Sequence, residues 1–174
     1  MKKGLSLRKI SYYLPKNVQT NDQLILLHPD WDIHKVQEKT GIFQRYIANK
    51  DETSLDLGFL ACKSLFKEYD VKPKEIDTLL FISQTPDYAL PPSSCILQEK
   101  LFMRNNILAL DINLGCSGFV NSLAVASSLL QTKEINNCLI ICAETYSKFI
   151  KEEDRTNKMI FSDASSACLV EKGN

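Results

Sequence analysis

One segment constrains the fold of this chain more than any other, because an apolar run changes abruptly into small residues and then into a helical pattern. The apolar run is 107–112, the small residues at 115–118 surround Cys116, and the helical pattern covers 120–132. Apolar residues at both alternating positions are typical of a strand buried on both faces in a parallel sheet. The sequence therefore predicts that Cys116 lies where a buried strand passes directly into a helix.

This place in a fold suits a reactive cysteine. The amides at the start of a helix carry partial positive charge, so a thiolate there is favoured over a thiol. The same amides can bind the oxyanion that forms when an acyl group is attacked. Cys116 is therefore a candidate acyl-accepting nucleophile. The alternative is a small buried residue that packs at a tight turn, and the local pattern leaves both interpretations open.

Strand-like and helix-like segments alternate along the rest of the chain. The expected strands are 5–13, 43–48, 77–83, 107–112 and 137–143, with further strand material in 159–171. The expected helices are 21–27, 32–39, 55–69, 93–102 and 120–132, and 144–158 reads as a polar loop. This alternation predicts an α/β protein with a mainly parallel or mixed sheet flanked by helices. With no repeat and no linker, we expect residues 1–174 to form one domain.

Composition excludes several classes of function. Lys and Arg number 21 and Asp and Glu also number 21, so the charge balance favours no polyanionic partner such as nucleic acid. We expect no signal peptide and no membrane span, because no apolar run is long enough. The six cysteines are scattered without a CxxC pair, and there are only two histidines. We therefore expect reduced thiols in a cytoplasmic protein, with no bound metal.

Several short motifs occur in an order that resembles the N-terminal half of β-ketoacyl-acyl-carrier-protein synthase III, a member of the thiolase-like superfamily. The matching pieces are Tyr13-Leu14-Pro15 with Thr20-Asn21, Lys39-Thr40-Gly41-Ile42 with Arg45, Leu90-Pro91 with Ser94-Cys95 and Gln98, 111–119 around Cys116, and Asp154-Arg155 leading to Phe161-Ser162-Asp163. Together they span nearly the whole chain. The resemblance implies a thiolase-like half fold and favours Cys116 as a nucleophile.

The resemblance also implies a reaction of fatty acid biosynthesis in two stages. An acyl group passes from acyl-coenzyme A to the cysteine, and malonyl-acyl carrier protein then loses carbon dioxide and condenses with the thioester. The family uses a histidine and an asparagine of its C-terminal half for the second stage. Neither His28 nor His34 matches that histidine. We therefore expect the C-terminal half to be absent from this chain and the chain alone to be inactive in condensation, and we expect no permanently bound cofactor.

Further site residues are implied by the same resemblance. Arg155 matches an arginine that stacks on the adenine of coenzyme A, and Thr40 matches a residue at the mouth of the substrate tunnel. Lys39 stands where an arginine is usual, so it keeps the charge without the bidentate fork. Trp31 is either an adenine contact or a packed aromatic, because it lies farther from the Thr-Gly-Ile motif than the family's tryptophan. Leu90 replaces an aromatic residue that shapes the partner's acyl pocket in the dimer.

Two alternatives to this function remain open at this stage. A related thiolase-fold acyltransferase, for example of the hydroxymethylglutaryl-CoA synthase type, would use the same cysteine with a different acceptor. A non-catalytic dimerisation module would leave Cys116 unmodified by acyl-coenzyme A. In each case we expect self-association, as a homodimer, because the family pairs its sheets through the N-terminal half.

Overall fold

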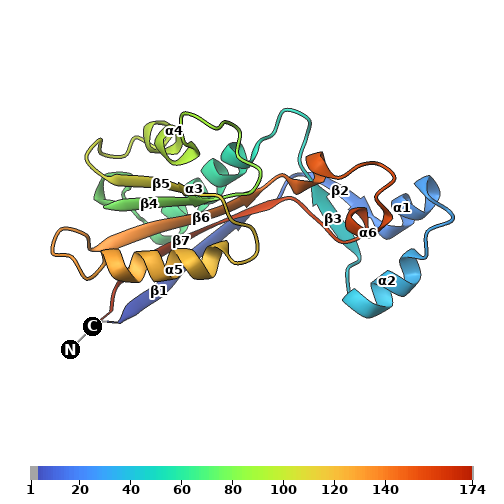
Figure 1. The fold of residues 1–174 in the computed structure, drawn as a ribbon, viewed down its shortest axis with the longest axis horizontal. Helices are drawn as coiled ribbons and strands as arrows, with labels where there is room; N and C mark the ends of the chain where they lie inside the picture. The colour runs from blue at the N-terminus through green and yellow to red at the C-terminus, as the bar shows by residue number, and fades with distance from the viewer. Residues whose placement is uncertain (1–3, 174) are drawn as a thin grey trace.

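A five-stranded mixed sheet forms the larger part of the molecule in the computed structural model, which describes residues 4–173 (Figure 1). Its strand order is β1-β7-β6-β4-β5. β4 pairs in parallel with both β5 and β6, whereas β7 pairs antiparallel with β6 and with β1. The strands are β1 (Leu5–Tyr13), β4 (Thr78–Ile82), β5 (Leu108–Ile112), β6 (Asn137–Glu144) and β7 (Ala164–Lys172). The α/β class with a mixed sheet is thus confirmed.

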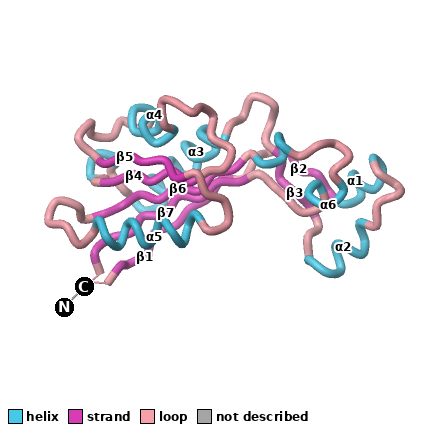
Figure 2. Tube along the Cα trace, in the orientation of Figure 1, coloured by secondary structure: helices cyan, strands magenta, loops and turns pink. Residues whose placement is uncertain are grey.

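Helices cover the two faces of this sheet unequally. On one face, α3 (Ser54–Tyr69) and α4 (Ser93–Lys100) pack on the odd-numbered residues of β4 and β6, such as Phe81 and Ile141. On the other face, α5 (Gly118–Leu129) packs on even-numbered residues, such as Leu80 and Ile140. Figure 2 shows α5 alone in front of the sheet. Alternate residues of the central strands therefore enter separate cores, as their period of two requires.

A smaller lobe lies at the far end of the molecule from the two termini (Figure 1). Its antiparallel ribbon pairs β2 (Asn17–Thr20) with β3 (Gln44–Ile47). The helices of the lobe are α1 (Asn21–Leu27), α2 (Ile33–Thr40) and α6 (Arg155–Lys158), and Tyr146–Phe149 forms a short 3-10 helix on the chain that enters the lobe. Leu24, Ile33 and Met159 make its small core. The lobe is therefore built from two segments that are far apart in the sequence, 17–47 and 146–159.

Two fully buried charged side chains fasten the smaller lobe together. Arg45 on β3 is 1% exposed, and its guanidinium donates to the Met159 carbonyl and, at 2.6 Å, to the Asn21 side-chain oxygen. The Asp163 carboxylate accepts the backbone amides of Ala48 at 2.7 Å and Ser147 at 2.9 Å. Because buried charges are tolerated only when they are hydrogen-bonded, these contacts fix β3 against the chain around α6.

Helix starts follow the capping preferences of the sequence. Thr53 and Asp56 form a capping box at the start of α3. The start of α4 has no side-chain cap of its own. Instead, the Asp111 carboxylate on β5 accepts the amides of Ser93 at 2.7 Å and Ser94 at 2.8 Å. The strand that leads to Cys116 is therefore fixed to the helix beside it.

The prediction that the 107–112 strand is buried on both faces is wrong for this chain. β5 lies at the edge of the sheet, where it pairs with β4 alone. Leu108 is 37% exposed and Leu110 is 41% exposed, because α5 packs over β4 and β6 and leaves them uncovered. The apolar pattern correctly indicates a face that would be stable when buried, but no element of residues 4–173 buries all of that face.

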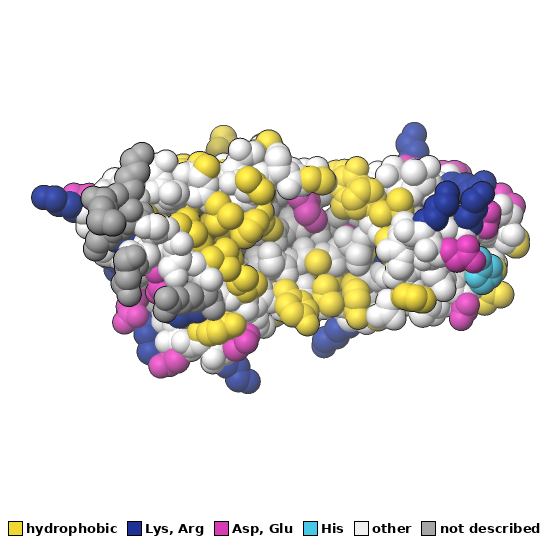
Figure 3. All heavy atoms as spheres, turned by 90° about the horizontal axis from the view of Figure 1, so that it is seen from below, with side chains coloured by type: hydrophobic (Ala, Val, Ile, Leu, Met, Phe, Trp, Pro, Cys, Tyr) yellow, Lys and Arg dark blue, Asp and Glu magenta, His cyan; other side chains and the backbone are white. Residues whose placement is uncertain are grey.

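An extended apolar surface is open on the α5 side of the molecule. Val120 on α5 is 68% exposed, and Ile10 and Tyr12 on β1 are also exposed. Seen from below the orientation of Figure 1, apolar side chains gather across the middle of the molecule (Figure 3). Contiguous apolar surface of this kind marks an interaction site. Within residues 4–173, no helix combines the length and the apolarity needed to cross a bilayer.

Candidate active site

Cys116 lies in the turn that joins β5 to α5. β5 ends at Ile112, and the Gly118 amide donates to the Gly115 carbonyl at 2.8 Å, which closes a tight turn around the cysteine. Ser117 is the N-cap of α5 and makes no side-chain capping bond. The predicted strand-to-helix position is therefore present, and Cys116 is exposed immediately before the N-cap of a 12-residue helix.

Both glycines of this turn have close neighbours, but only Gly118 lies against a buried strand end. A Cβ atom added to Gly118 would lie 2.3 Å from Cγ2 of Ile82, at the end of β4. A Cβ added to Gly115 would lie 2.5 Å from the side-chain oxygen of Gln84. Contacts below 3.0 Å force something to move, so Gly118 lets the turn approach the end of β4, whereas the flexible end of the Gln84 side chain could shift to admit a Cβ at Gly115.

Cys116 opens into a cavity of about 320 Å³ at the carboxyl ends of β4, β5 and β6. Ligands in open α/β sheets bind at this end of the strands. The lining is Ile82, Gln84, Gly115, Cys116, Phe119, Cys142, Glu144, Tyr146, Phe161 and Ser162. The rings of Tyr146 and Phe161 meet at 4.8 Å between centroids. The cavity thus combines an apolar wall that suits an acyl chain with a few polar groups.

Among residues 4–173, Glu144 is the only one that brings a side-chain carboxylate to the lining of this cavity. Its oxygens accept the Gln84 amide at 2.9 Å, the Thr85 hydroxyl at 2.8 Å and, more weakly, the Ser83 hydroxyl at 3.5 Å. Burial raises the pKa of Glu144, and these donors partly offset that rise. The carboxylate therefore joins the end of β6 to the loop after β4.

The other cysteines are less suited to nucleophilic chemistry. Burial raises the pKa of Cys142, which shares the cavity, to about 11, and that of Cys138 to about 12. Both remain thiols at neutral pH, and a thiol is a poor nucleophile. Only Cys95 and Cys116 are exposed, and Cys95 lies on α4 outside the lining of the cavity. Cys116 is thus the cysteine that is both accessible and placed in the cavity.

Four of the other site residues named from the sequence lie in the smaller lobe. Arg155 begins α6 and is exposed. Lys39 and Thr40 end α2 and are exposed, and the Thr40 hydroxyl donates to the Val36 carbonyl at 2.7 Å. Trp31 is half-buried and stacks on His28 with 3.8 Å between ring centroids. These residues belong to the lobe that the carboxyl ends of β4, β5 and β6 face, whereas Cys116 lies in the turn between β5 and α5 (Figure 1).

Trp31 and Leu90 occupy different kinds of environment. Besides stacking on His28, Trp31 packs against the small core of Leu24, Ile33 and Met159. This is the packed-aromatic position, and one face of the indole is already occupied by the imidazole. Leu90, in contrast, is 81% exposed in the loop before α4 and precedes a cis proline, Pro91. It does not line the cavity of Cys116 in this chain.

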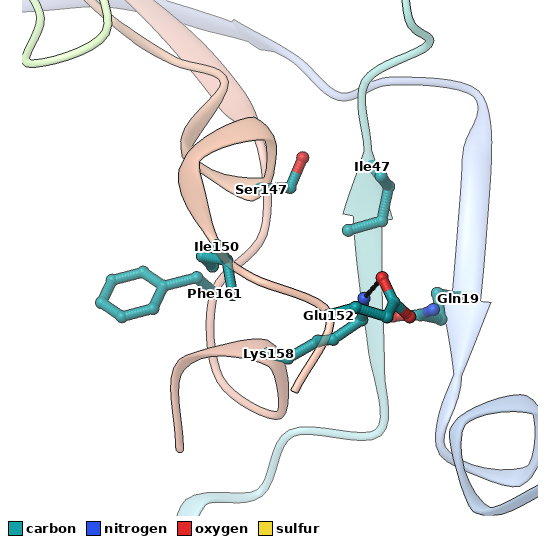
Figure 4. A pocket seen from close by; sticks show the side chains of 7 residues that line it. All are labelled: Gln19, Ile47, Ser147, Ile150, Glu152, Lys158 and Phe161. Atoms are coloured by element: carbon teal, nitrogen blue, oxygen red, sulfur yellow. Dashed lines mark hydrogen bonds and ion pairs between the residues drawn. The ribbon is translucent and has the colours of Figure 1, made fainter. Parts of the chain in front are cut away.

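A second hollow, of about 230 Å³, lies between the β2–β3 ribbon and the chain around α6 (Figure 4). Gln19 and Ile47 line it from the ribbon, and Ile150 and Phe161 line it from the chain around α6. Its two charged residues, Lys158 and Glu152, form an ion pair with each other. Because these charges compensate one another, the hollow presents no net charge to a ligand.

Sequence reasoning missed Gln84, Glu144 and Tyr146 as members of the cavity. It assigned Gln84 to the loop between the 77–83 strand and the 93–102 helix, and it assigned Glu144 and Tyr146 to a polar loop. A usable indication was present, because each of them lies at the end of a buried strand or within two residues after it. Parallel strands bring their carboxyl ends to the same edge, so residues just after β4 and β6 must lie near the turn that follows β5.

Comparison with known proteins agrees with this geometry. The family described as 3-oxoacyl-[acyl-carrier-protein] synthase III matches residues 110–174. The β-ketoacyl-[acyl-carrier-protein] synthase III of Caldanaerobacter subterraneus subsp. tengcongensis is 34% identical over 161 residues, which cover 91% of this chain and 47% of the relative. The corresponding enzyme of Clostridium perfringens is 37% identical over 161 residues, covering 91% and 48%. A 3-oxoacyl-(acyl-carrier-protein) synthase III crystal structure superposes with a TM-score of 0.93 at 39% identity, covering 98% of this chain and 50% of that one.

The mixed sheet, the helix on each face and the cysteine at the strand-to-helix turn define a thiolase-like half fold. Within that class, the chain matches the N-terminal half of β-ketoacyl-acyl-carrier-protein synthase III, a transferase, and the resemblance drawn from the sequence is confirmed. The chain spans about half the length of the curated relatives that it matches.

Proposed function

We propose that Cys116 accepts an acyl group from acyl-coenzyme A. The observation that carries this proposal is the exposed Cys116 side chain at the start of α5, opening into a largely apolar cavity. The sulfur attacks the thioester carbonyl, and amides at the turn bind the resulting oxyanion. The bond between the carbonyl carbon and the coenzyme A sulfur then breaks. Coenzyme A leaves as a thiol with the proton that Cys116 gave up, and Cys116 keeps the acyl group.

The second stage, condensation with malonyl-acyl carrier protein, requires a second half that completes the enzyme. The open apolar surface on the α5 side supports this part of the proposal, because such a surface is costly in water. In the complete enzyme, that half would cover α5 and provide the histidine and asparagine for decarboxylation. The chain alone would contribute the nucleophile and remain inactive in condensation.

The smaller lobe would hold the nucleotide end of coenzyme A. Arg155 would stack on the adenine, since a guanidinium is planar and always charged. Thr40 would lie at the tunnel mouth, and Lys39 would attract phosphate as a point charge. Trp31 is the weakest member of this set, because its stacking on His28 already uses one face of the ring.

The complete enzyme would act as a homodimer in the cytoplasm. The β5 edge supports the dimer, since an unpaired edge strand is a template for a strand of another copy. The exposed Leu90 would then reach the partner's acyl pocket, where a leucine leaves more room than an aromatic ring. The six unpaired cysteines suit a reducing compartment.

Intact-mass measurement after incubation with acyl-coenzyme A tests the acyl transfer. The wild-type complete protein that carries this chain should gain one acyl mass, and Cys116→Ser should gain none. Cys95→Ser is the matched control, because it removes the other exposed thiol and should leave the gain unchanged. A wild-type protein that gains no mass would refute the proposal and favour a non-catalytic dimerisation module.

The acceptor is tested separately, on the acylated protein. Release of a β-ketoacyl product with malonyl-acyl carrier protein, and no 3-hydroxy-3-methylglutaryl product from the acetylated protein with acetoacetyl-coenzyme A, is the expected result. The opposite pattern would indicate chemistry of the hydroxymethylglutaryl-CoA synthase type.

A further inference from the structure

A continuous set of hydrogen bonds joins the end of β6 to the loop that follows β4. Glu144 accepts the backbone amide of Gln84 at 2.9 Å and the hydroxyl of Thr85 at 2.8 Å. The Thr85 hydroxyl also accepts the Thr145 amide at 3.0 Å, and the Thr85 amide donates to the Ser83 hydroxyl at 3.0 Å. Ser83, Thr85 and Thr145 are all buried. The conformation of this loop therefore depends on the Glu144 carboxylate.

The same loop contacts the turn that carries the nucleophile. Gln84 extends its side chain over Gly115, so closely that a Cβ at Gly115 would lie 2.5 Å from the Gln84 oxygen. Gly115 immediately precedes Cys116. Gln84, Gly115, Cys116 and Glu144 all line the same cavity. A displacement of the loop would therefore change how the Gln84 side chain packs against Gly115. Cys116 and Glu144 are connected in this way although they are 28 positions apart.

We propose that Glu144 is a positioning residue for Cys116: it fixes the loop after β4, and Gln84 on that loop holds the Gly115–Cys116 turn in the orientation that accepts the acyl group. This role rests on the proposed acyl transfer. Glu144 takes no part in the transfer itself. Misplacement of a reacting group by about 1 Å can cost on the order of a hundredfold in rate, so the position of the Cys116 turn should strongly affect the rate of acylation.

Three variants separate the positioning effect of Glu144 from the effect of its charge and from a general loss of folding. Glu144→Ala removes the charge and every hydrogen bond, whereas Glu144→Gln removes the charge but keeps an oxygen that can accept the Gln84 amide. Gln84→Ala leaves the loop bonded and removes only its contact with Gly115. The control is Glu99→Ala, an exposed glutamate on α4. The measurement is single-turnover acylation of the complete protein by acyl-coenzyme A.

The expected result is a loss of maximal rate without a loss of substrate affinity. Glu144→Ala and Gln84→Ala should each lower the maximal acylation rate by about tenfold or more, with half-saturation by acyl-coenzyme A within about twofold of wild type. The double variant should be no slower than the slower single variant, because both changes break one connection. Glu144→Gln should retain more activity than Glu144→Ala. Fully additive losses, or a wild-type rate in Glu144→Ala, would overturn the proposal.

A second measurement keeps this test independent of the proposed function. Iodoacetamide alkylates Cys116 when the sulfur displaces iodide, and Cys95 in the same chain provides the internal reference. In Glu144→Ala, the ratio of Cys116 to Cys95 alkylation should be at least about threefold lower than in Glu144→Gln. Both variants are uncharged at position 144, so the comparison isolates the hydrogen bonds. Equal ratios in the two variants would refute the positioning role. Absence of acylation in the wild type would refute only the acyl transfer.

Discussion

The contact between Gly118 and Ile82 allows a quantitative test of how the nucleophile turn is built. In Gly118→Ala, the added Cβ would lie 2.3 Å from Cγ2 of Ile82 and 3.3 Å from Cβ of Leu114. Carbon atoms in proteins normally approach to about 3.5–4.0 Å, so the first contact is too short by more than about 1 Å. Ile82 is buried at the end of a fully buried strand and has little room to move. The start of α5 must therefore shift away from β4.

The expected cost follows from two opposing effects. Overpacking of a buried contact costs about 1–3 kcal/mol. Replacing glycine by alanine in a helix returns at most about 1 kcal/mol, and less at the first helical position. The free energy of unfolding of this chain should therefore fall by about 1–2 kcal/mol. Because Cys116 lies two residues before Gly118, acylation in the complete protein should fall as well.

Urea denaturation followed by circular dichroism measures the change in stability. The matched control is Gly4→Ala, where an added Cβ would meet nothing within 4 Å, and its unfolding free energy should stay within about 0.5 kcal/mol of wild type. Ile82→Ala removes the clashing methyl, so the double variant should lose less than the sum of the single losses. A Gly118→Ala protein as stable as wild type, or strictly additive losses, would refute the reasoning.

Three further predictions concern the cap of α4, the buried carboxylate and the open edge. Asp111→Ala should lower the unfolding free energy by about 1–2 kcal/mol in urea denaturation, because the amides of Ser93 and Ser94 lose their acceptor, whereas Asp111→Asn should lose less. Burial raises the pKa of Glu144 above its ordinary 4.5, so the folded state binds more protons than the unfolded state above about that pH. The wild type should therefore lose stability relative to Glu144→Gln as pH rises above about 4.5, and a constant difference from pH 4 to 8 would contradict this sign. The chain should exceed monomer mass in light scattering, and Leu110→Lys on the β5 edge should shift it toward the monomer, unlike the exposed surface change Glu38→Lys.

The local parts of this fold are readable from the sequence. The capping box of Thr53 and Asp56 indicates where α3 begins. Gly41 indicates where α2 ends, and it adopts a φ of 71° there. The strand–turn–helix around Cys116 is also where its pattern places it. Each of these features depends on neighbours within a few positions, so the sequence contains all the information needed. Long-range order is different, because strand order cannot be read from periodicity.

The errors follow from that limit. An apolar run such as 107–112 indicates that both faces are to be covered but not which element, or which chain, covers them. The same holds for the cavity, where Glu144 and the amide of Gln84 meet across 60 positions. The serines at 162, 165 and 166 adopt no positive φ, and two of them lie within β7. Among the described non-glycine residues only Asp70 and Phe102 do so.

The two margins of the five-stranded sheet differ in how readily they accept another strand. β1 carries a register irregularity between Leu7 and Lys9, and Lys9 forms an ion pair with Glu171, features that discourage edge-to-edge pairing. β5 keeps an unbroken register with β4 from Leu108 to Ile112. When two copies pair through their β5 edge strands, neither copy has a free β5 edge left. Assembly by this route is therefore self-limiting at two copies and gives no continuous fibre.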